Sequence, residues 1–381
     1  MYLKNLHLRS FRNYVDRQIE FRAKKTILVG NNAQGKSNLL EAVELLASLK
    51  SHRTTRDREL VLDSAQLGQV QATIERAYGT SQLSIIFRKQ GRRTVAVNKE
   101  TLRRQLDFLG VLNAVRFSSL DLDLVRGAPD SRRSWIDGLL IQLEPVYSSI
   151  LQQYNQVLRQ RNALLKKIRA TKESSSGETT DDYEPQLKLW DEQLAAAGSR
   201  VARRRARVIA RLAPIARSWH QRISGNEQLE INYLPNVEWT EDDPTQVQQA
   251  FLDKIQQRRL AEQYQGKTVV GTHRDEIEFT IDTTPARYYG SQGQQRTLVL
   301  ALKLAELKLI EEVVGEPPLL LLDDVLAELD PNRQQQLLEV IGDRFQTIIT
   351  TTHIDTFNHE WIKNSQILAV EAGQISEVLL N

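Results

Sequence analysis

The sequence contains no cysteine among its 381 residues. The absence of thiols excludes a disulfide framework, a cysteine nucleophile, a zinc site with cysteine ligands and an iron–sulfur cluster, and it fits a reducing compartment. The sequence also lacks any apolar run close to the roughly 18 residues that a membrane-spanning helix needs. We therefore expect a cytoplasmic protein without a membrane partner.

An excess of charge of one sign is also lacking. The chain has 51 Lys and Arg against 48 Asp and Glu, which gives a formal net charge of +3. This small excess permits a polyanionic partner but does not require one. At about 150 residues per domain, the length predicts two to three domains.

A glycine-rich loop follows a short apolar segment near the N-terminus. Residues 26–29 predict a buried strand, and the helical spacing of Leu39, Leu40, Val43 and Leu46 predicts a helix after the loop. Between them, GNNAQGKS at 30–37 matches G-x-x-x-x-G-K-[ST], in which glycines let the backbone amides surround phosphate. Lys36 would neutralise the β and γ phosphates of a nucleotide and Ser37 would hold Mg²⁺. A glycine turn that merely precedes a helix explains the length of the motif less well. The predicted nucleotide-binding residues of this loop are Gly30, Asn31, Asn32, Ala33, Gln34, Gly35, Lys36, Ser37 and Asn38.

Two acidic residues end a second apolar segment. In LLLLDD at 319–324, four leucines precede Asp323 and Asp324. Asp323 would bind Mg²⁺, and Asp324 would orient or deprotonate the attacking water. Paired acids after a strand can also cap the next helix, but the phosphate loop favours the nucleotide interpretation. His353 follows another predicted strand and could reach a γ phosphate, although a lone histidine there is more often a surface residue.

A second anion site is predicted at SQGQQR, residues 291–296, directly before a helix expected at 297–310. Ser291, the amide of Gly293 and the dipole of that helix would together bind a phosphate group. The chain thus has two helix ends suited to phosphate.

The period of the apolar residues changes twice along the chain. Up to residue 130, alternation predicts strands in a sheet that carries the phosphate loop, with an attached antiparallel meander. From about 140 to 219, apolar residues recur every three or four positions, which predicts an antiparallel helical hairpin with arginines at two seam positions, 161 and 205, and a polar linker at 172–182. We predict an α/β fold with the N-terminal part of an ATPase head at 1–130, a helical arm at 131–224 and the C-terminal part of the head at 225–381.

Together these motifs resemble an ABC-type ATPase, with AELD at Ala327–Asp330 as the D-loop and His353 as the switch histidine. A helical hairpin between Lys36 and Ser291 resembles the branch of chromosome-maintenance (SMC) and break-repair ATPases. Within that branch the chain is similar to the RecF family of bacterial recombination mediators over nearly its whole length. The motifs that carry the resemblance are SFRNY at 10–14, GNNAQGKSNLLEA at 30–42, GTHRDE at 271–276 and YGSQGQQRTLVLALKLAE at 289–306.

The resemblance implies two chains that face head to tail and share two ATP molecules with Mg²⁺. Arg12 would then contact the nucleotide of its own chain. The signature and D-loop residues would contact the nucleotide of the partner chain, through Ser291, Gln292, Gly293, Gln294 and Asp330. The resemblance further implies a weak, DNA-stimulated ATPase that acts as a switch, duplex or gapped DNA as a ligand bound without sequence preference, and a nucleoid-associated location. It implies RecR and RecO as partners, RecA loading at gaps covered by single-strand binding protein, and support of the SOS response.

Six arginines within residues 200–211 predict a phosphate track on the second arm of the hairpin. A solvated helix face whose arginines pair with neighbouring acids explains the same pattern equally well. The candidate DNA-binding residues are Arg200, Arg203, Arg204, Arg207 and Arg211, with Arg132 and Arg133 as further candidates.

Two other functions remain open at this point. A transport or translation ABC ATPase is disfavoured by the divergent signature, the inserted hairpin and the lack of a membrane segment. A structural DNA-binding protein with vestigial nucleotide sites is disfavoured by the presence of Lys36, Ser37 and Asp323.

Overall fold

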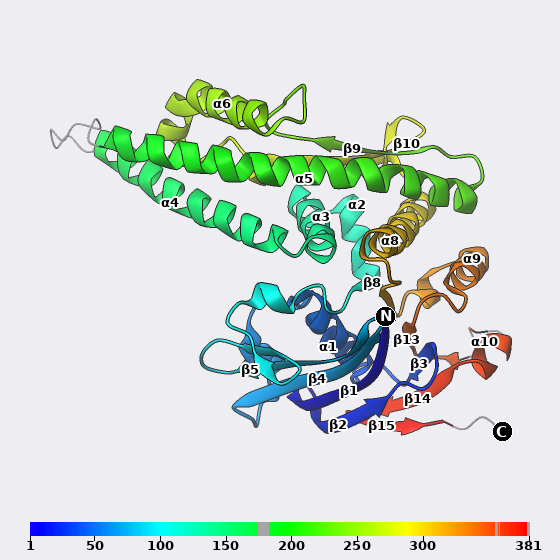
Figure 1. Cartoon of the computed structure of the whole chain (residues 1–381). Coiled ribbons are helices and arrows are strands. Elements are labelled where there is room, and N and C mark those ends of the chain that lie inside the picture. The colour runs from blue at the N-terminus through cyan, green and yellow to red at the C-terminus, as the bar shows by residue number, and fades with distance from the viewer. Residues whose placement is uncertain (174–182, 355–356, 358, 379–381) are drawn as a thin grey trace.

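The computed structural model describes residues 1–173, 183–354, 357 and 359–378. Figure 1 shows a lower part built from sheets and an upper part built from long helices. The N-terminus lies between the two parts. From residue 174 to residue 182, the predicted polar linker lies outside the described residues.

The nucleotide motifs lie on a six-stranded sheet with the strand order β15-β14-β3-β13-β12-β8. All neighbours in it are parallel except β15, which runs antiparallel to β14. Its strands are Lys25–Val29 (β3), Ala114–Ser118 (β8), Leu319–Asp323 (β12), Thr347–Thr351 (β13), Gln366–Glu371 (β14) and Gln374–Glu377 (β15). The central strands are buried along nearly their whole length, which explains why leucine, isoleucine, valine and threonine make up most of them. Segments from both ends of the chain thus build one sheet.

A second six-stranded sheet, entirely antiparallel, has the order β2-β1-β4-β5-β6-β7. Its strands are Tyr2–Phe11 (β1), Tyr14–Glu20 (β2), Leu67–Arg76 (β4), Gly79–Arg88 (β5), Thr94–Val97 (β6) and Glu100–Thr101 (β7). The predicted meander is confirmed. Helix α1, Lys36–Ser48, contacts strands of both sheets and fills the space between them.

The upper part holds the predicted hairpin. Its long helices are Pro129–Leu143 (α3), Tyr147–Glu173 (α4), Glu184–Ser224 (α5) and Pro244–Gln265 (α6). Helices α4 and α5 lie side by side as the two arms (Figure 1). The sequence pattern continues from α3 into α4, but the helix breaks between Leu143 and Tyr147, because Pro145 has no N–H to continue the helical hydrogen bonds.

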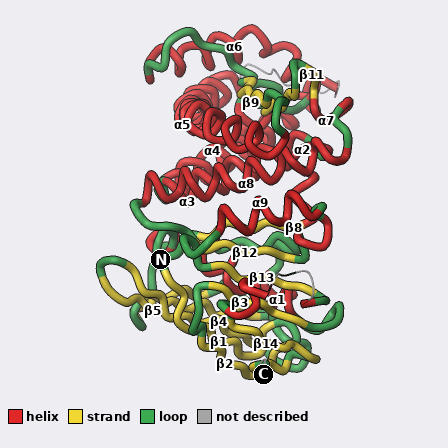
Figure 2. Tube along the Cα trace, turned by 90° about the vertical axis from the view of Figure 1, so that its right-hand side faces the viewer, coloured by secondary structure: helices red, strands yellow, loops and turns green. Residues whose placement is uncertain are grey.

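The remaining elements lie between the two parts or beside one of them. Figure 2 shows α8 and α9 between strand β12 and helix α5. A three-stranded sheet, β11-β10-β9, lies beside α5 and away from the two large sheets, although the sequence grouped its residues with the head. The bounds are Leu229–Leu234 (β9), Glu276–Ile281 (β10), Thr284–Pro285 (β11), Asp123–Arg126 (α2), Ala286–Tyr289 (α7), Gln292–Val314 (α8), Pro331–Ile341 (α9) and His359–Lys363 (α10). None of the helices in the described part of the chain has the length and apolar character to cross a bilayer.

The two arginines at the hairpin seam are buried inside the helical layer. Arg161 bonds to carboxylates of α5 and α6, Asp191 at 2.8 Å and Glu262 at 2.6 Å. Arg205 bonds to both carboxylate oxygens of Asp137 at 2.9 Å and to Asp275 at 3.0 Å. These ion pairs fix the arms to the helices and loops around them.

Replacing Arg205 by alanine should therefore lower the free energy of unfolding by about 3 to 5 kcal/mol, because Asp137 and Asp275 would stay buried without their cation. Urea denaturation followed by circular dichroism measures this change. Arg200→Ala removes an exposed arginine from the same helix and should change stability by no more than about 0.5 kcal/mol. Equal losses in the two variants would show that the buried pair has no special importance.

Candidate nucleotide-binding site

The loop between β3 and α1 holds the first predicted motif in the expected context. Gly35 has a φ of 121°, a conformation that glycine adopts without steric cost. Lys36 is buried, and its Nζ donates to the carbonyl oxygens of Gly30 at 2.6 Å and Asn31 at 2.9 Å. The ammonium group therefore lies at the loop, where a phosphate chain would need it.

Neighbouring turns hold the outer side of this loop. Asn13 Nδ2 donates to the carbonyl oxygen of Gln34 at 2.9 Å, and the amide of Gly373 donates to the same oxygen at 3.0 Å. The hydroxyl of Tyr14 donates to the carbonyl oxygen of Gly35 at 2.9 Å. The loop is thus shaped by the β1–β2 turn and the β14–β15 turn, which are far from it in sequence.

Gly30 is packed against strand β14 so closely that a Cβ would lie 2.3 Å from the carbonyl oxygen of Val370. Gly30→Ala should cost about 2 to 3 kcal/mol of stability and lower the melting temperature, because backbone on both sides must move. Gly138→Ala is the matched control: a Cβ there meets nothing within 4 Å, and alanine favours helix by up to about 1 kcal/mol. Differential scanning calorimetry would compare the two, and a harmless Gly30→Ala would contradict this packing.

The end of β12 meets the start of α1 through a chain of oxygen contacts. Ser37 Oγ donates to Asp323 Oδ1 at 2.7 Å, and Thr350 Oγ1 of β13 donates to the same oxygen at 2.9 Å. The serine hydroxyl and the carboxylate form an oxygen pair that suits Mg²⁺, which is usually held by one or two carboxylates together with substrate phosphates and water. In the described part of the chain no cluster of three or more His, Asp or Glu side chains offers a complete metal cage. The residues present therefore fit a Mg²⁺ ion that arrives with phosphate.

Asp324 stands directly after this pair in a left-handed conformation, with a φ of 54°. Its amide donates to Thr350 Oγ1 at 2.9 Å, so the threonine holds both acids in place. Burial raises the pKa of Asp324, Lys36 lowers it, Asp323 raises it further, and the net pKa is above the usual range. A carboxylate with a raised pKa is a better proton acceptor for a water molecule.

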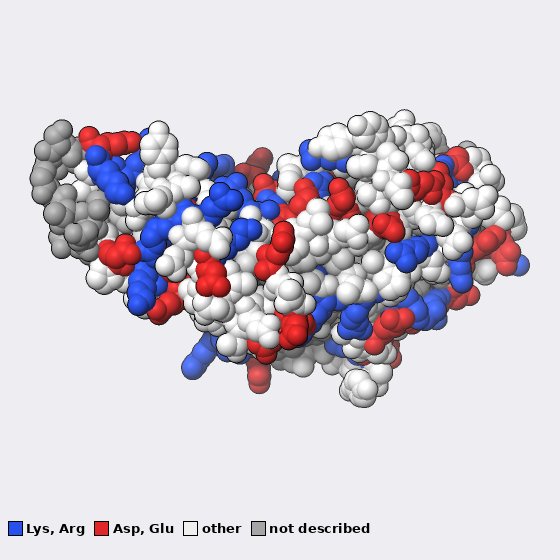
Figure 3. Space-filling view, turned by 90° about the horizontal axis from the view of Figure 1, so that it is seen from above, with Lys and Arg blue, Asp and Glu red and all other residues white. Residues whose placement is uncertain are grey.

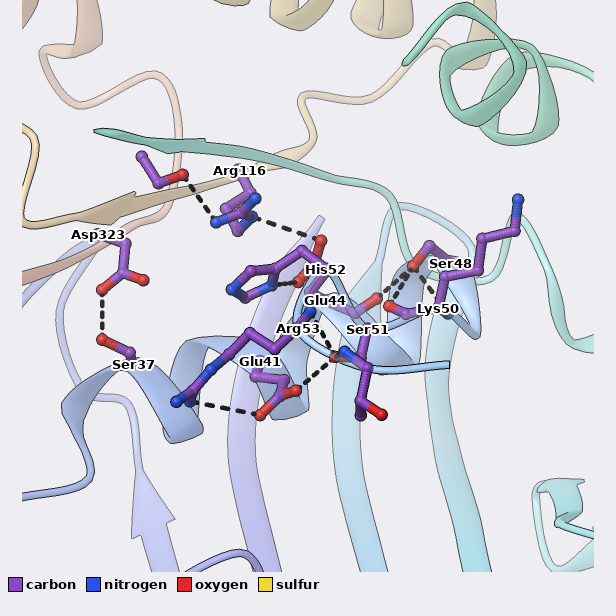
Figure 4. A network of polar contacts seen from close by, with 12 residues as sticks. Ser37, Glu41, Glu44, Ser48, Lys50, Ser51, His52, Arg53, Arg116 and Asp323 are labelled. Carbon is purple, nitrogen blue, oxygen red and sulfur yellow. Dashed lines mark hydrogen bonds and ion pairs between the residues drawn. The ribbon is translucent and has the colours of Figure 1, made fainter. Parts of the chain in front are cut away.

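A network that the sequence analysis missed lies behind the loop (Figure 4). Glu41 of α1 is fully buried and accepts two hydrogen bonds from Arg12, at 2.8 and 2.6 Å, and one from Ser51 at 2.5 Å. Burial favours a raised pKa for Glu41, but the hydrogen bonds from Arg12 and Ser51 outweigh it and the pKa is lowered. Arg12, the predicted nucleotide contact, is thus held by an acid of α1. The SHR segment at 51–53 was the available sequence signal.

The same network continues to strand β8. His52 Nδ1 and Glu44 Oε2 are hydrogen-bonded at 2.5 Å, and Arg116 of β8 lies 3.4 Å from the other Glu44 oxygen. Arg53 donates to Oδ1 of Asn38, the residue that follows Ser37, at 2.5 Å. The loop that follows α1 is therefore connected to the phosphate loop by side chains.

The predicted signature segment lies at the start of α8. Ser291 caps this helix: its Oγ accepts from the amide of Gln294, and the Gln294 side chain accepts from the amide of Ser291. Ser291 and Gln292 are exposed, and Gly293 is partly exposed. The N-terminus of this 23-residue helix is thus open to an anion from outside the chain.

Asp330 of the predicted D-loop caps α9 and is joined to the signature helix. Its carboxylate accepts from the amide of Arg333 at 3.1 Å and pairs with the Arg333 guanidinium. Arg333 Nε also donates to Thr297 Oγ1 of α8 at 2.8 Å. The amide of Arg333 is the largest cause of the lowered pKa of Asp330, so this carboxylate is charged. His353 is exposed just after β13, where its amide and carbonyl both bond to Thr351 Oγ1.

The predicted arginine track on α5 is largely paired within the chain. Arg203 and Arg207 both donate to Asp242, at 2.5 Å each, and Arg204 donates to Glu144. Figure 3, which views the helical layer from above, shows acidic side chains among the basic ones. Arg200 and Arg211 are exposed. The arginines of α5 thus fit a solvated helix face paired with acids better than a phosphate track.

Arg132 and Arg133 are engaged at the base of the arm. Arg132 is buried and donates to both oxygens of Glu276 at 2.7 Å. The prediction that it contacts DNA at the surface is therefore wrong, because its side chain forms an interior ion pair. Arg133 donates to the carbonyl oxygen of Asp275 at 2.6 Å and pairs with Asp130.

Comparisons with known proteins agree with the geometry. Residues 2–376 match the family model described as RecF/RecN/SMC N terminal domain. The chain is 70% identical to the DNA replication and repair protein RecF of Gloeothece citriformis, over 99% of this chain and 100% of that protein. The corresponding RecF of Nostoc punctiforme is 66% identical, over 98% of this chain and 99% of that protein.

Solved structures give the same result. The structure of RecF-ATPrS in the RecFOR pathway superposes with a TM-score of 0.90 at 31% identity, covering 99% of this chain and 98% of that one. An Smc head domain from Pyrococcus furiosus shares the fold, with a TM-score of 0.54 at 16% identity and coverage of 100% and 96%. These likenesses confirm the predicted α/β ATPase head with a helical arm. The chain belongs to the RecF family.

Proposed function

We propose that this chain is an ATP-controlled DNA-binding protein of recombinational repair and replication. The observation that carries the proposal is the contact of Ser37 Oγ with Asp323 Oδ1, which joins the phosphate loop to the end of β12 in one oxygen-lined site. The RecF relatives with solved structures include complexes described as RecF-ATP and RecF-ATPrS, which support ATP as the nucleotide.

The site has two halves that lie on different helix ends. The first half contains Lys36, Ser37, Asp323 at the end of β12 and Asp324 directly after it, and the second is the exposed, capped start of α8. We propose that the second half completes the site of another copy, with two chains arranged head to tail around two ATP molecules. Ser291, Gln292, Gly293, Gln294 and Asp330 would then act on the nucleotide of the partner chain.

Each residue of the first half has a distinct task. Lys36 neutralises charge on the β and γ phosphates, while Ser37 and Asp323 would hold Mg²⁺. When bound, Mg²⁺ offsets the negative charge of the phosphates. Asp324 orients the attacking water and accepts its proton, and the exposed His353 would approach the γ phosphate from the end of β13.

ATP then acts as a switch for assembly. Interactions that form only in the dimer bias the chains toward association. Loss of the γ phosphate removes its contact with Ser291, and the two chains then separate. The base, Asp324, is one methylene shorter than a glutamate and should hold the attacking water less well. We therefore propose weak ATP hydrolysis that DNA stimulates, with a single-turnover rate below about 10 per second. The partners that we propose for this switch are RecR and RecO, and its outcome is the loading of RecA at gaps covered by single-strand binding protein. We propose that it acts on gapped duplex DNA in the nucleoid and supports the SOS response.

Two measurements test the proposal. Fluorescence anisotropy of a labelled duplex with a single-strand gap should show the tightest binding with ATP–Mg²⁺ and weaker binding with ADP or without nucleotide. Rapid-quench hydrolysis of bound ATP should be slow and faster with DNA. DNA affinity that is identical in all nucleotide states would instead favour a structural DNA-binding protein with vestigial sites. A transport-type ATPase would hydrolyse ATP without any response to DNA.

A further inference from the structure

A groove outside the nucleotide site separates the antiparallel sheet from the base of the helical layer. One wall is formed by the end of α1, the β5–β6 loop and residues 101–106, and the other by the end of α3 and the start of α4. In Figure 1, α4 passes above these segments of the sheet. Its charged lining side chains, among the described residues, are all basic: Lys50, Arg92, Arg93, Arg103 and Arg104.

The sequence segments that build the sheet side of this groove concentrate positive charge. Residues 50–58, 88–93 and 99–104 together contain eleven Lys or Arg and two Asp or Glu, a net charge of +9. The whole chain has a net charge of only +3, so the rest of it is net acidic. The segments are separated in sequence, and only the folding of the β-sheet brings them to one place.

Several of these cations have no counter-charge. Lys50, Arg92 and Arg103 are exposed, and in the described part of the chain no ion pair or hydrogen bond engages the charged ends of their side chains. Figure 4 shows Lys50 pointing away from the Glu41 network. Two others in the groove are neutralised, since Arg93 pairs with Asp57 and Arg104 with Asp107. Like charges gathered without partners repel each other, so their placement gives the fold no stability and favours an anionic ligand.

The contrast with helix α5 is direct. There, Arg203, Arg204 and Arg207 face acids of the same chain, and a phosphate would have to displace those acids. At the groove a phosphate would meet lysine and arginine side chains that lack a competitor, with Ser148 and Gln152 of α4 opposite as hydrogen-bond donors.

We propose that this groove binds the sugar–phosphate backbone of DNA, with Lys50, Arg92 and Arg103 as the principal phosphate contacts. The inference rests on the proposed function, because it assigns a place to the DNA that the function requires. Phosphate groups are the same at every base pair, so contacts from these three cations select the backbone and not the sequence. Release of counterions by the three cations makes binding dependent on salt.

The test compares two triple variants of the full chain that lose the same charge. The groove variant carries Lys50→Gln, Arg92→Gln and Arg103→Gln, and the arm variant carries Arg200→Gln, Arg207→Gln and Arg211→Gln. Anisotropy of a labelled duplex with a single-strand gap is measured with ATP–Mg²⁺ over a range of salt concentrations. The groove variant should lose at least about tenfold in affinity, and the slope of log K against log salt should fall by about 2 to 3, since each phosphate contact contributes about 0.9. The arm variant should bind within about threefold of wild type.

Each outcome decides the proposal. Equal losses in both variants would show a general effect of net charge, and a larger loss in the arm variant would indicate that DNA binds the arginines of α5. Either result would contradict the proposal that DNA binds in the groove. Binding of ATP to the groove variant, measured with a fluorescent analogue, controls for folding and should match wild type. If the wild type itself does not bind DNA, the proposed function fails. If it does and the groove variant binds equally well, only this inference fails.

Discussion

Replacing Asp324 by asparagine should slow ATP hydrolysis by about 100-fold or more, because a general base contributes about that much or more to a hydrolysis rate. The substitution is isosteric, and the Asp324 backbone would still bond to Thr350. ATP should therefore still bind, and the ATP-bound assembly should persist for longer. Rapid-quench measurement of bound ATP gives the rate, and filter binding gives the affinity.

The pH dependence adds a second readout. The pKa of Asp324 is raised, mainly by burial, and a base must be ionised to accept a proton. The wild-type rate should thus decrease as pH falls toward this pKa, at a higher pH than an ordinary aspartate would give. The Asp324→Asn variant should lose this dependence. Asp323→Asn is the contrasting control, since it should weaken Mg²⁺-dependent ATP binding itself. A fast Asp324→Asn enzyme would remove Asp324 from the mechanism.

Replacing Ser291 by aspartate should lower ATP-dependent dimer affinity by about 100-fold or more. Aspartate caps a helix about as well as serine, so α8 should begin at the same residue. Its charge would face the γ phosphate of the partner chain, and like charges about 4 Å apart repel by about 4 kcal/mol near a protein surface. Light scattering with ATP–Mg²⁺ measures the association, and ATP binding by the monomer should not change.

Ser291→Asn provides the matched control, because asparagine has nearly the same shape, caps the helix and adds no charge. It should retain dimerisation to within about 1 kcal/mol. Dimerisation retained by both variants would mean that Ser291 does not face a phosphate. Dimerisation lost in both would mean that the hydroxyl of Ser291 itself, and not the absence of charge, is what the assembly needs.

The sequence was sufficient for features whose cause is local. The strand, glycine loop and helix around Lys36 follow from a contiguous motif, and the buried seam of the hairpin follows from helical spacing, with Arg161 and Arg205 correctly placed on it. The break at Pro145 also has a local cause. The apolar period runs on from Leu140 to Tyr147 without a gap, but the proline decides where α3 ends.

Features that depend on the order of the strands were not accessible. Thr350 contacts Asp323 from 27 positions away, because β12 and β13 are neighbours in the sheet. The acids that neutralise the α5 arginines, such as Asp242 and Glu144, come from separate elements and no periodicity indicates them. Similarly, the basic groove is assembled from three sequence segments. Charge clustered on one helix was more visible in the sequence than charge that the sheet gathers.

The central claim is that each ATP site is completed by a second chain, and mixing two inactive variants tests it most directly. Lys36→Ala disables the first half of the site and Ser291→Asp the second, so neither protein alone should hydrolyse ATP. A mixed dimer contains one site built from the intact halves of both chains, and the mixture should therefore regain hydrolysis that rises with protein concentration. A mixture as inactive as its components, under conditions in which the wild type hydrolyses ATP, would contradict the composite site.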